Sequence, residues 1–387
     1  MAAKNLKMHI AVYILNRKKN QAMSNSVTTT QNDIFHTLSV LSIKYDCETL
    51  MALVPIVTDP IYSLGLLPYL ALFCCAVEEY CQEAGQDVDF FKVSPFNLAE
   101  IRCRLKLFDD RYGRTKNKIT TIDDLQNTYF ANLLRFRFLK RLNVHYNLGI
   151  YIDNDNHMIG NTQYMHYMFQ DKRFSQSNRM HKENIQALGY VMGSTVGSVY
   201  EGLKDVGAPL NAQISSIDVP LFYKDYNTNR SFNSFPNHED GKELTLRLVH
   251  ILCALNFVEK SLKSVINNTN LWFVRAKYIA FYYAYRSIKT VNNKYPGMIS
   301  IFDSNRIERL VNSNFRSCMM HYSYKKDGQP LIDSNFLDPN VSFFGLIKSC
   351  FGMSFDDFNC ELDSAINQLS TILENLLNFD FSDKKPI

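Results

Sequence analysis

The residues best suited to chemistry are an arginine and a histidine near the end of the chain. Arg316 and His321 lie in the stretch from Asn314 to Tyr322. Arginine carries a permanent positive charge, and its planar guanidinium binds phosphate oxygens in a fixed geometry. Histidine titrates near neutral pH, so it can both give and take protons there. The two residue types together predict chemistry on a phosphate group.

The spacing of this pair and its helical surroundings resemble the HEPN family (higher eukaryotes and prokaryotes nucleotide-binding), whose ribonucleases carry an arginine and a histidine separated by four to six residues. The resemblance covers the chain from Asp240 to the C-terminus and implies a four-helix bundle. It implies cleavage of RNA without a metal ion or other cofactor, in which the ribose 2′-hydroxyl attacks the adjacent phosphate and leaves a 2′,3′-cyclic phosphate. His321 would move the proton, and Arg316 would bind the phosphate oxygens. Such an enzyme would act as a toxin or as an antiviral defence effector.

Polar residues beside the pair extend the predicted RNA site. They are Ser317, Tyr322, Lys325 and Lys326, which would orient or attract RNA. Ser317 departs from the family, in which an asparagine often follows the arginine. Serine can still form hydrogen bonds, but it cannot supply an amide.

A second basic group lies on a helix predicted from Leu125 to Leu142, where basic residues are interleaved with leucine and phenylalanine. Its members are Arg135, Arg137, Lys140 and Arg141. Basic side chains can hold a phosphate backbone while aromatic rings stack on bases. The alternative is an ordinary helix with a solvated basic face and a buried apolar face.

The expected helix geometry places a constraint on the pair. A helix predicted from Arg306 to about Tyr324 would put Arg316 and His321 about 140° apart around its axis and about 7.5 Å apart along it. One straight helix would not aim both side chains at one atom. Either the helix unwinds near Met320, or two chains combine their motifs across a two-fold axis. HEPN ribonucleases commonly combine two chains, so a homodimer is part of the prediction.

Two other interpretations remain open. A histidine at a helix end is often structural, and Arg316 would then pair with a carboxylate such as Glu308. Alternatively, the helical module would bind RNA or a regulatory protein partner without cutting, as a sensor or regulatory subunit.

Composition is that of a folded chain. The 387 residues are 46% hydrophobic and 21% charged, and a net charge of +4 permits binding to a polyanion without requiring it.

The nine cysteines include no CxxC pair, so they predict reduced thiols in a cytoplasmic protein rather than disulfides or a metal site. The apolar run Ile61–Val77 contains Gly65 and Pro68 and is shorter than a membrane span, which favours a buried core helix and no membrane partner.

The predicted fold class is mainly α, with a HEPN-like bundle at 241–387, a linker-like segment at 207–240 and a larger helical region at 1–206 that carries a small β-hairpin around Asp153–Asn156. Apolar spacing and prolines predict the N-terminal helices Ile34–Ile43, Cys47–Val57 and Tyr69–Ala84, and residues 111–118 are predicted as a loop. In the bundle, the same signals predict Leu244–Ile266, Leu271–Val291, Arg306–Tyr324 and Glu361–Leu377.

Overall fold

The structure, a computed structural model, describes residues 31–83, 97–134, 145–168, 182–206, 214–215, 220–230, 232–301, 304–326, 328–337 and 342–387. The predicted basic group Arg135, Arg137, Lys140 and Arg141 lies outside these ranges. Helices dominate the described residues, and a small antiparallel sheet accompanies them. The mainly α fold class is therefore confirmed.

The described helices are α2 (Gln31–Leu53), α3 (Pro60–Glu83), α4 (Leu98–Cys103), η1 (Arg104–Lys106), α5 (Tyr112–Leu133), α7 (Gln163–Met168), α9 (Lys182–Leu203), α10 (Gly241–Asn256), the π-helical turn η2 (Phe257–Leu262), α11 (Leu271–Lys294), α12 (Ser304–Arg309), α13 (Ser313–His321), η3 (Ser334–Phe336), α14 (Ser342–Phe351) and α15 (Phe355–Leu377). The strands are β1 (Leu148–Ile152), β2 (Met158–Asn161), β3 (Phe222–Tyr226), β4 (Lys325–Lys326), β5 (Gln329–Pro330) and β6 (Lys385–Pro386).

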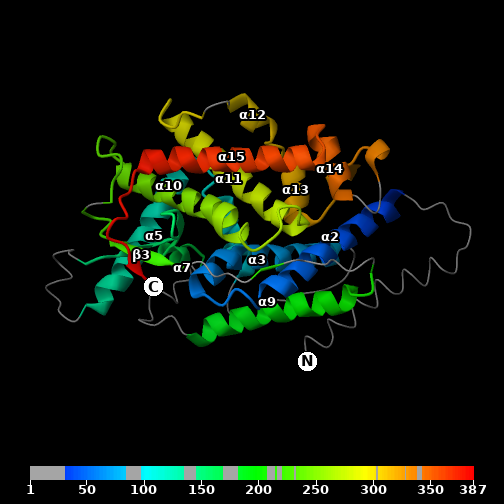
Figure 1. Ribbon diagram of the computed structural model, residues 1–387, viewed down its shortest axis with the longest axis horizontal. Helices are drawn as coiled ribbons and strands as arrows, with labels where there is room; N and C mark the ends of the chain where they lie inside the picture. The colour runs from blue at the N-terminus through cyan, green and yellow to red at the C-terminus, as the bar shows by residue number, and fades with distance from the viewer. Residues whose placement is uncertain are drawn as a thin grey trace, which may run out of the picture.

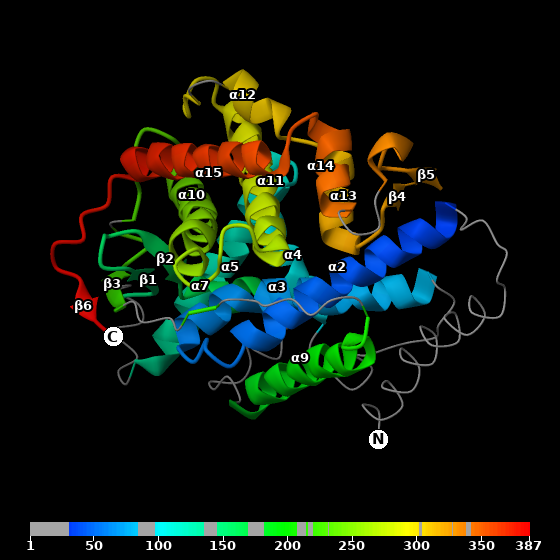
Figure 2. The same ribbon diagram turned by 45° about the vertical axis from the view of Figure 1, so that its right-hand side comes forward.

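The helices form two main layers. Helices α2, α3 and α9 pack together on one side of the molecule, and α10, α11 and α15 pack together on the other (Figure 1). Helix α15 crosses both α10 and α11, and α13 lies beside α11 and α3 (Figure 2). The helix that carries the predicted catalytic pair thus connects the two layers.

The predicted hairpin is present as β1 and β2. Asp153 forms its turn, because its carboxylate accepts hydrogen bonds from the backbone N–H groups of Asp155 (2.9 Å) and His157 (2.8 Å). The hairpin belongs to a sheet of order β2-β1-β3-β6, whose last strand pairs Lys385 with Tyr223. The sheet therefore joins the N-terminal region, the linker-like segment and the C-terminal residues.

One continuous hydrophobic core runs through the described residues. Helix α10 packs on β2, α11 packs on α2 and η1, and α13 packs on α3. These contacts join parts that the sequence places on opposite sides of 207–240. The segment therefore does not separate two cores, and β3 in its middle is a strand of the shared sheet.

Three helix boundaries in the N-terminal region differ from the prediction. Helix α2 continues where a break between Ile43 and Cys47 was expected, and α5 begins at Tyr112 within the expected loop. Helix α3 runs through Pro68, which is buried inside it. Proline removes one backbone hydrogen bond and disfavours a helix interior, but burial of the surrounding apolar residues outweighs this local preference.

Helix α3 is a core helix, as its interrupted apolar run predicts. By length and composition it is the one helix in the described ranges that could cross a membrane, and 72% of its most apolar window is buried inside the protein. Its Gly65 meets the ring of Phe257 so closely that an added Cβ would lie 2.3 Å from the ring. Glycine is thus required where η2 packs on α3.

Candidate functional site at helix α13

Helix α13 carries both Arg316 and His321 and begins at its own cap. The side chain of Asn312 accepts hydrogen bonds from the backbone N–H groups two residues (2.9 Å) and three residues (3.0 Å) further on. Such a cap satisfies donors that a helix start leaves free. The single helix predicted from Arg306 to Tyr324 is therefore wrong, because α12 ends at Arg309 and Asn312 caps the start of a separate helix, α13.

The apolar stripe predicted for this helix faces the core. Phe315, Cys318 and Met319 are buried, and the ring of Phe315 lies 4.5 Å from that of Tyr278 on α11 and 4.9 Å from that of Phe351 on α14, between centroids. Close aromatic packing of this kind leaves little room for the helix to shift. The polar residues of α13 are thus held on a rigid support.

A buried arginine fastens the C-terminal end of α13. The guanidinium of Arg275 donates hydrogen bonds to the carbonyls of Cys318 (3.1 Å) and Met319 (2.9 Å), and its Nε lies 2.6 Å from a carboxylate oxygen of Asp46. Although burial acts to lower the pKa of Arg275, the Asp46 carboxylate raises it overall. The helix end is therefore held by a charged group that also ties it to α2.

Tyr322 follows the helix in the left-handed conformation, with φ of 52°, and ends it. Its side chain is 2% exposed, and its hydroxyl donates a 2.6 Å hydrogen bond to Asp46. Tyr322 therefore has almost no exposed surface on which an RNA base could stack. The predicted RNA contact at Tyr322 is replaced by a structural role in the core.

His321 forms a polar cluster with two residues from the N-terminal layer. Its Nδ1 lies 2.7 Å from a carboxylate oxygen of Glu79 on α3, and the other carboxylate oxygen lies 2.8 Å from Arg102 on α4. Burial acts to raise the pKa of Glu79, but the hydrogen bond with His321 and the charge of Arg102 hold it below its usual value. The His321 side chain is 37% exposed, so a histidine oriented by a carboxylate lies at the surface.

Arg316 lies against α11, where its guanidinium carbon is 5.7 Å from the ring centroid of Tyr282 and 6.0 Å from that of Tyr283. Among the described residues, no carboxylate pairs with it. Glu308, the partner that a structural role would predict, lies 2.5 Å from Lys289 instead. Arg316 is half-buried, so it is a cation held in place by aromatic rings with its charge not neutralised by a described partner.

The two side chains rest on different elements. Helix α13 stays regular through His321, so the unwinding near Met320 that would bring Arg316 and His321 together does not occur. Arg316 packs on α11, whereas His321 bonds to α3. Within one chain, the ideal separation of about 140° therefore applies.

The other predicted RNA contacts vary in exposure. Ser317 is half-buried on α13, and Lys325 lies 5.3 Å from the ring centroid of Phe35. Lys326 is exposed and donates a 3.1 Å hydrogen bond to the side chain of Asn314. Of these residues, Lys326 is placed most openly beside α13.

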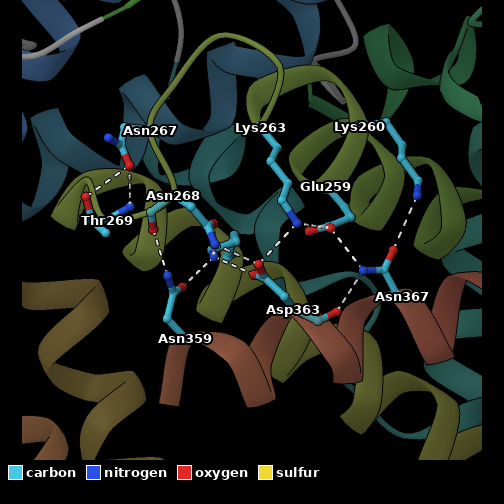
Figure 3. Close-up of polar contacts among 10 residues, drawn as sticks. Glu259, Lys260, Lys263, Asn267, Asn268, Thr269, Asn359, Asp363 and Asn367 are labelled. Atoms are coloured by element: carbon cyan, nitrogen blue, oxygen red, sulfur yellow. Dashed lines mark hydrogen bonds and ion pairs between the residues drawn. The ribbon is translucent and has the colours of Figure 1, made fainter. Parts of the chain in front are cut away.

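A second polar cluster lies between η2, α11 and α15, and Figure 3 shows its members. Asp363 lies 3.1 Å from Lys263 and 2.5 Å from Lys277, and Lys263 also lies 2.5 Å from Glu259. Lys277 is 0% exposed and donates to the side chains of Asn268 (2.6 Å) and Asn359 (2.5 Å). Since the acidic and basic groups neutralise one another, this cluster joins helices rather than offering charge to a ligand.

Comparisons with protein-family models, with curated proteins and with solved structures give no match. Within the described ranges, no group of three or more His, Cys, Asp or Glu side chains is arranged to hold a metal ion. All nine cysteines are described, and none forms a disulfide. The assignment of a function therefore depends on the geometry around α13 and on the resemblance.

Sequence reasoning missed the residues that support the pair. Glu79 and Arg102 lie more than 200 positions before His321, and no local pattern connects them. The tyrosines beside Arg316 belong to an aromatic run in the segment that forms α11. A run of that kind is typical of a core helix, so it gave no signal of a cation site.

Proposed function

We propose that the protein is a metal-independent endoribonuclease of the HEPN type, with Arg316 and His321 as its catalytic residues. The observation that carries this proposal is the partly exposed Arg316, without a carboxylate partner among the described residues, on the same short helix as a surface histidine oriented by a carboxylate. A toxin or antiviral role is part of the same proposal, and rests on the resemblance alone. RNA is the substrate because its 2′-hydroxyl supplies the nucleophile that DNA lacks.

Arg316 would bind the phosphate that is cleaved. A guanidinium without a carboxylate partner is available for two parallel hydrogen bonds to phosphate oxygens. The rings of Tyr282 and Tyr283 would hold it in place without neutralising it. As the 2′-oxygen forms its bond to phosphorus, charge grows on the phosphate oxygens, and this cation would stabilise it.

His321 would transfer the proton. Its Nδ1–H would donate to Glu79, which fixes the tautomer and leaves Nε2 for the substrate. As a base, Nε2 takes the proton of the 2′-hydroxyl while the bond from phosphorus to the 5′-oxygen breaks. The products are a 2′,3′-cyclic phosphate and a 5′-hydroxyl, whose proton comes from a general acid.

A homodimer would bring the complementary groups together. Arg316 and His321 rest on different elements of one chain, so a site built from the arginine of one chain and the histidine of its partner removes the conflict. A two-fold axis would create two such sites. Lys325 and Lys326 would attract RNA at their edges, and Ser317 would orient it.

The test is cleavage of total RNA by the purified full chain in excess EDTA, with mapping of the ends. We expect cyclic-phosphate ends, and a loss of at least about 100-fold in Arg316→Ala and in His321→Ala. Arg309→Ala on α12 is the matched control, because Arg309 is exposed and lies outside the site. Cleavage that is unchanged in both variants would show that the site lies elsewhere.

Mixing the two inactive variants tests the dimer. If each site takes Arg316 from one chain and His321 from the other, co-refolding should restore about a quarter of the activity, since half of the dimers are mixed and each holds one intact site. No recovery would place both residues of a site in one chain. RNA binding that Arg316→Ala abolishes, without cleavage by wild type, would favour the non-catalytic RNA-binding module.

A further inference from the structure

Arg104, in η1, is a buried cation without an acceptor among the described residues. It is 6% exposed, and its guanidinium carbon lies 3.2 Å from the ring centroid of Tyr164. Its Nε has no hydrogen-bond partner, and no carboxylate within the described ranges forms an ion pair with it. A buried charge without compensation is strongly unfavourable, so this residue calls for an explanation.

Two other buried arginines show what the fold ordinarily supplies. Arg275 has the Asp46 carboxylate, and Arg247 donates to the side chain (2.9 Å) and the carbonyl (3.0 Å) of Ser287. Arg104 has neither kind of partner in the described part of the chain. Although Nη1 of Arg247 also lacks a hydrogen-bond partner, Arg104 is the one of the three whose guanidinium makes no hydrogen bond or ion pair with a described residue.

The guanidinium lies at a small pocket between α3, η1, η2 and α11. Arg104 and Tyr69 line it together with the apolar residues Phe257, Ala254 and Ala280. Tyr69 is 4% exposed. Burial raises the pKa of Tyr69 while the charge of Arg104 opposes the rise, so the two groups are close. The two polar side chains among the lining residues, those of Arg104 and Tyr69, can both donate hydrogen bonds.

The chain after Arg104 holds it inward. Leu107 and Phe108 both adopt left-handed conformations, with φ of 44° and 63°, which residues other than glycine seldom do. Both are buried, and the Phe108 ring stacks on Tyr167 at 4.5 Å between centroids. The turn is therefore fixed by packing, and the arginine cannot swing out without disrupting it.

The neighbouring titratable groups supply no negative charge. Burial raises the pKa of Tyr164 and raises that of Cys253 to about 12, so both are neutral near pH 7. Burial, together with the charges of Arg104 and Lys118, lowers the pKa of His250 to about 3, so it is neutral as well. The described groups around Arg104 therefore supply no negative charge to balance it.

We propose that this pocket binds one small monovalent anion, such as chloride, between the Arg104 guanidinium and the Tyr69 hydroxyl. The free space is about the size of one water molecule, so it excludes a nucleotide, and a chloride ion, which is slightly larger than water, would fill it. Donors without acceptors favour an anion over a cation, and the apolar walls limit competition from water. The anion site is separate from α13, so the proposal for this site does not depend on whether the protein is a ribonuclease.

Thermal unfolding of the full chain tests the proposal. At equal ionic strength, sodium chloride and sodium bromide should raise Tm by about 2 °C or more relative to sodium gluconate, whose anion is too large for the pocket. Arg104→Met should abolish the difference, and Tyr69→Phe should reduce it. Tyr62→Phe is the matched control, since Tyr62 is also a buried tyrosine on α3 but does not line the pocket. Equal Tm in all three salts, or a shift that persists in Arg104→Met, would overturn the site.

Anomalous diffraction from crystals grown in sodium bromide gives a direct reading that does not depend on a folded variant. A bromide peak within hydrogen-bond distance of both Arg104 and Tyr69 would establish the anion. A water molecule there, with no anomalous signal, would overturn the proposal and leave a hydrated arginine. Should Arg104→Met fail to fold, this map and Tyr69→Phe decide the question.

Discussion

Arg275 and Arg104 are buried almost equally, at 3% and 6% exposure, yet their surroundings differ in kind. Arg275 has a carboxylate and two helix-terminal carbonyls, so its charge joins α2, α11 and α13. Arg104 instead lies against the ring of Tyr164 and lines a small pocket. The burial of a charged side chain is therefore not enough to assign its role; its hydrogen-bond and ion-pair partners must also be known. A satisfied arginine maintains the fold, and an unsatisfied one is available to a ligand.

Arg316 extends this comparison to the surface. Like Arg104, it leans on aromatic rings and lacks a carboxylate partner among the described residues, but it is only half-buried. A polyanion can therefore approach it, whereas the Arg104 pocket admits only a small ion. These two arginines, each without a carboxylate partner in the described part of the chain, predict ligands of very different size.

The largest expected effect is on the satisfied arginine. Arg275→Met should lower the free energy of unfolding by about 3–5 kcal/mol, because it leaves Asp46 buried without its counter-charge. Urea unfolding measures this. The double variant Asp46→Leu/Arg275→Met should recover much of the loss, since both charges are then gone. A loss below about 1 kcal/mol in the single variant would contradict the structural role.

The unsatisfied arginine should behave in the opposite way. In gluconate buffer without halide, Arg104→Met should raise the free energy of unfolding by about 1 kcal/mol, because a buried charge without a partner is removed. The same urea experiment, run beside Arg275→Met, makes the contrast direct. A loss comparable with that of Arg275→Met would mean that Arg104 has an acceptor within the protein.

The carboxylate that orients His321 should have a moderate effect on catalysis. Glu79→Gln should slow RNA cleavage about tenfold while leaving the protein folded, because the amide can still accept a hydrogen bond but no longer stabilises the protonated histidine. Cleavage rates at fixed RNA concentration measure this. Glu78→Gln, one residue away on α3, is the matched change of charge, and an equal loss there would remove the orienting role from Glu79.

The smallest expected effect is on the pH dependence of stability at the hairpin, where His157 lies 2.9 Å from Asp153. The hydrogen bond with Asp153 raises the pKa of His157 above its ordinary 6.5. Burial acts to raise the pKa of Asp153, but its bonds with His157 hold it below its ordinary 3.8. The histidine contributes stability below about pH 6.5 and loses it as pH rises through the raised pKa. The aspartate contributes above about pH 3.8 and loses it as pH falls through the lowered pKa.

The pair should therefore stabilise the protein most between about pH 4 and pH 6.5. Urea unfolding of wild type and His157→Asn should differ by about 0.5–1 kcal/mol at pH 5, and by less at pH 8. Parallel measurement of Asp153→Asn controls for the turn itself. A difference that grows from pH 5 to pH 8 would have the wrong sign and would exclude this linkage.

Much of the fold followed from local patterns. Apolar spacing predicted both ends of α11 and the C-terminal end of α15 to within a few residues. Turn residues predicted the hairpin around Asp153. The patterns failed at Pro68, where packing outweighs a local preference, and at Asn312, where a cap inside an apolar repeat divides one helix into two. Both failures arise because periodicity reports which face is apolar, and not whether the backbone continues.

The sequence by itself determined the mainly helical class, the apolar face of α13 and the spacing of Arg316 and His321, because each depends on residues a few positions apart. The contact of His321 with Glu79, the burial of Tyr322 on Asp46 and the lack of an acceptor for Arg104 among the described residues follow only from the three-dimensional arrangement. Pairing of charges depends on which distant segments the core brings together. Since the gain from an ion pair is small beside that from apolar burial, the core sets these partners and the charges follow it.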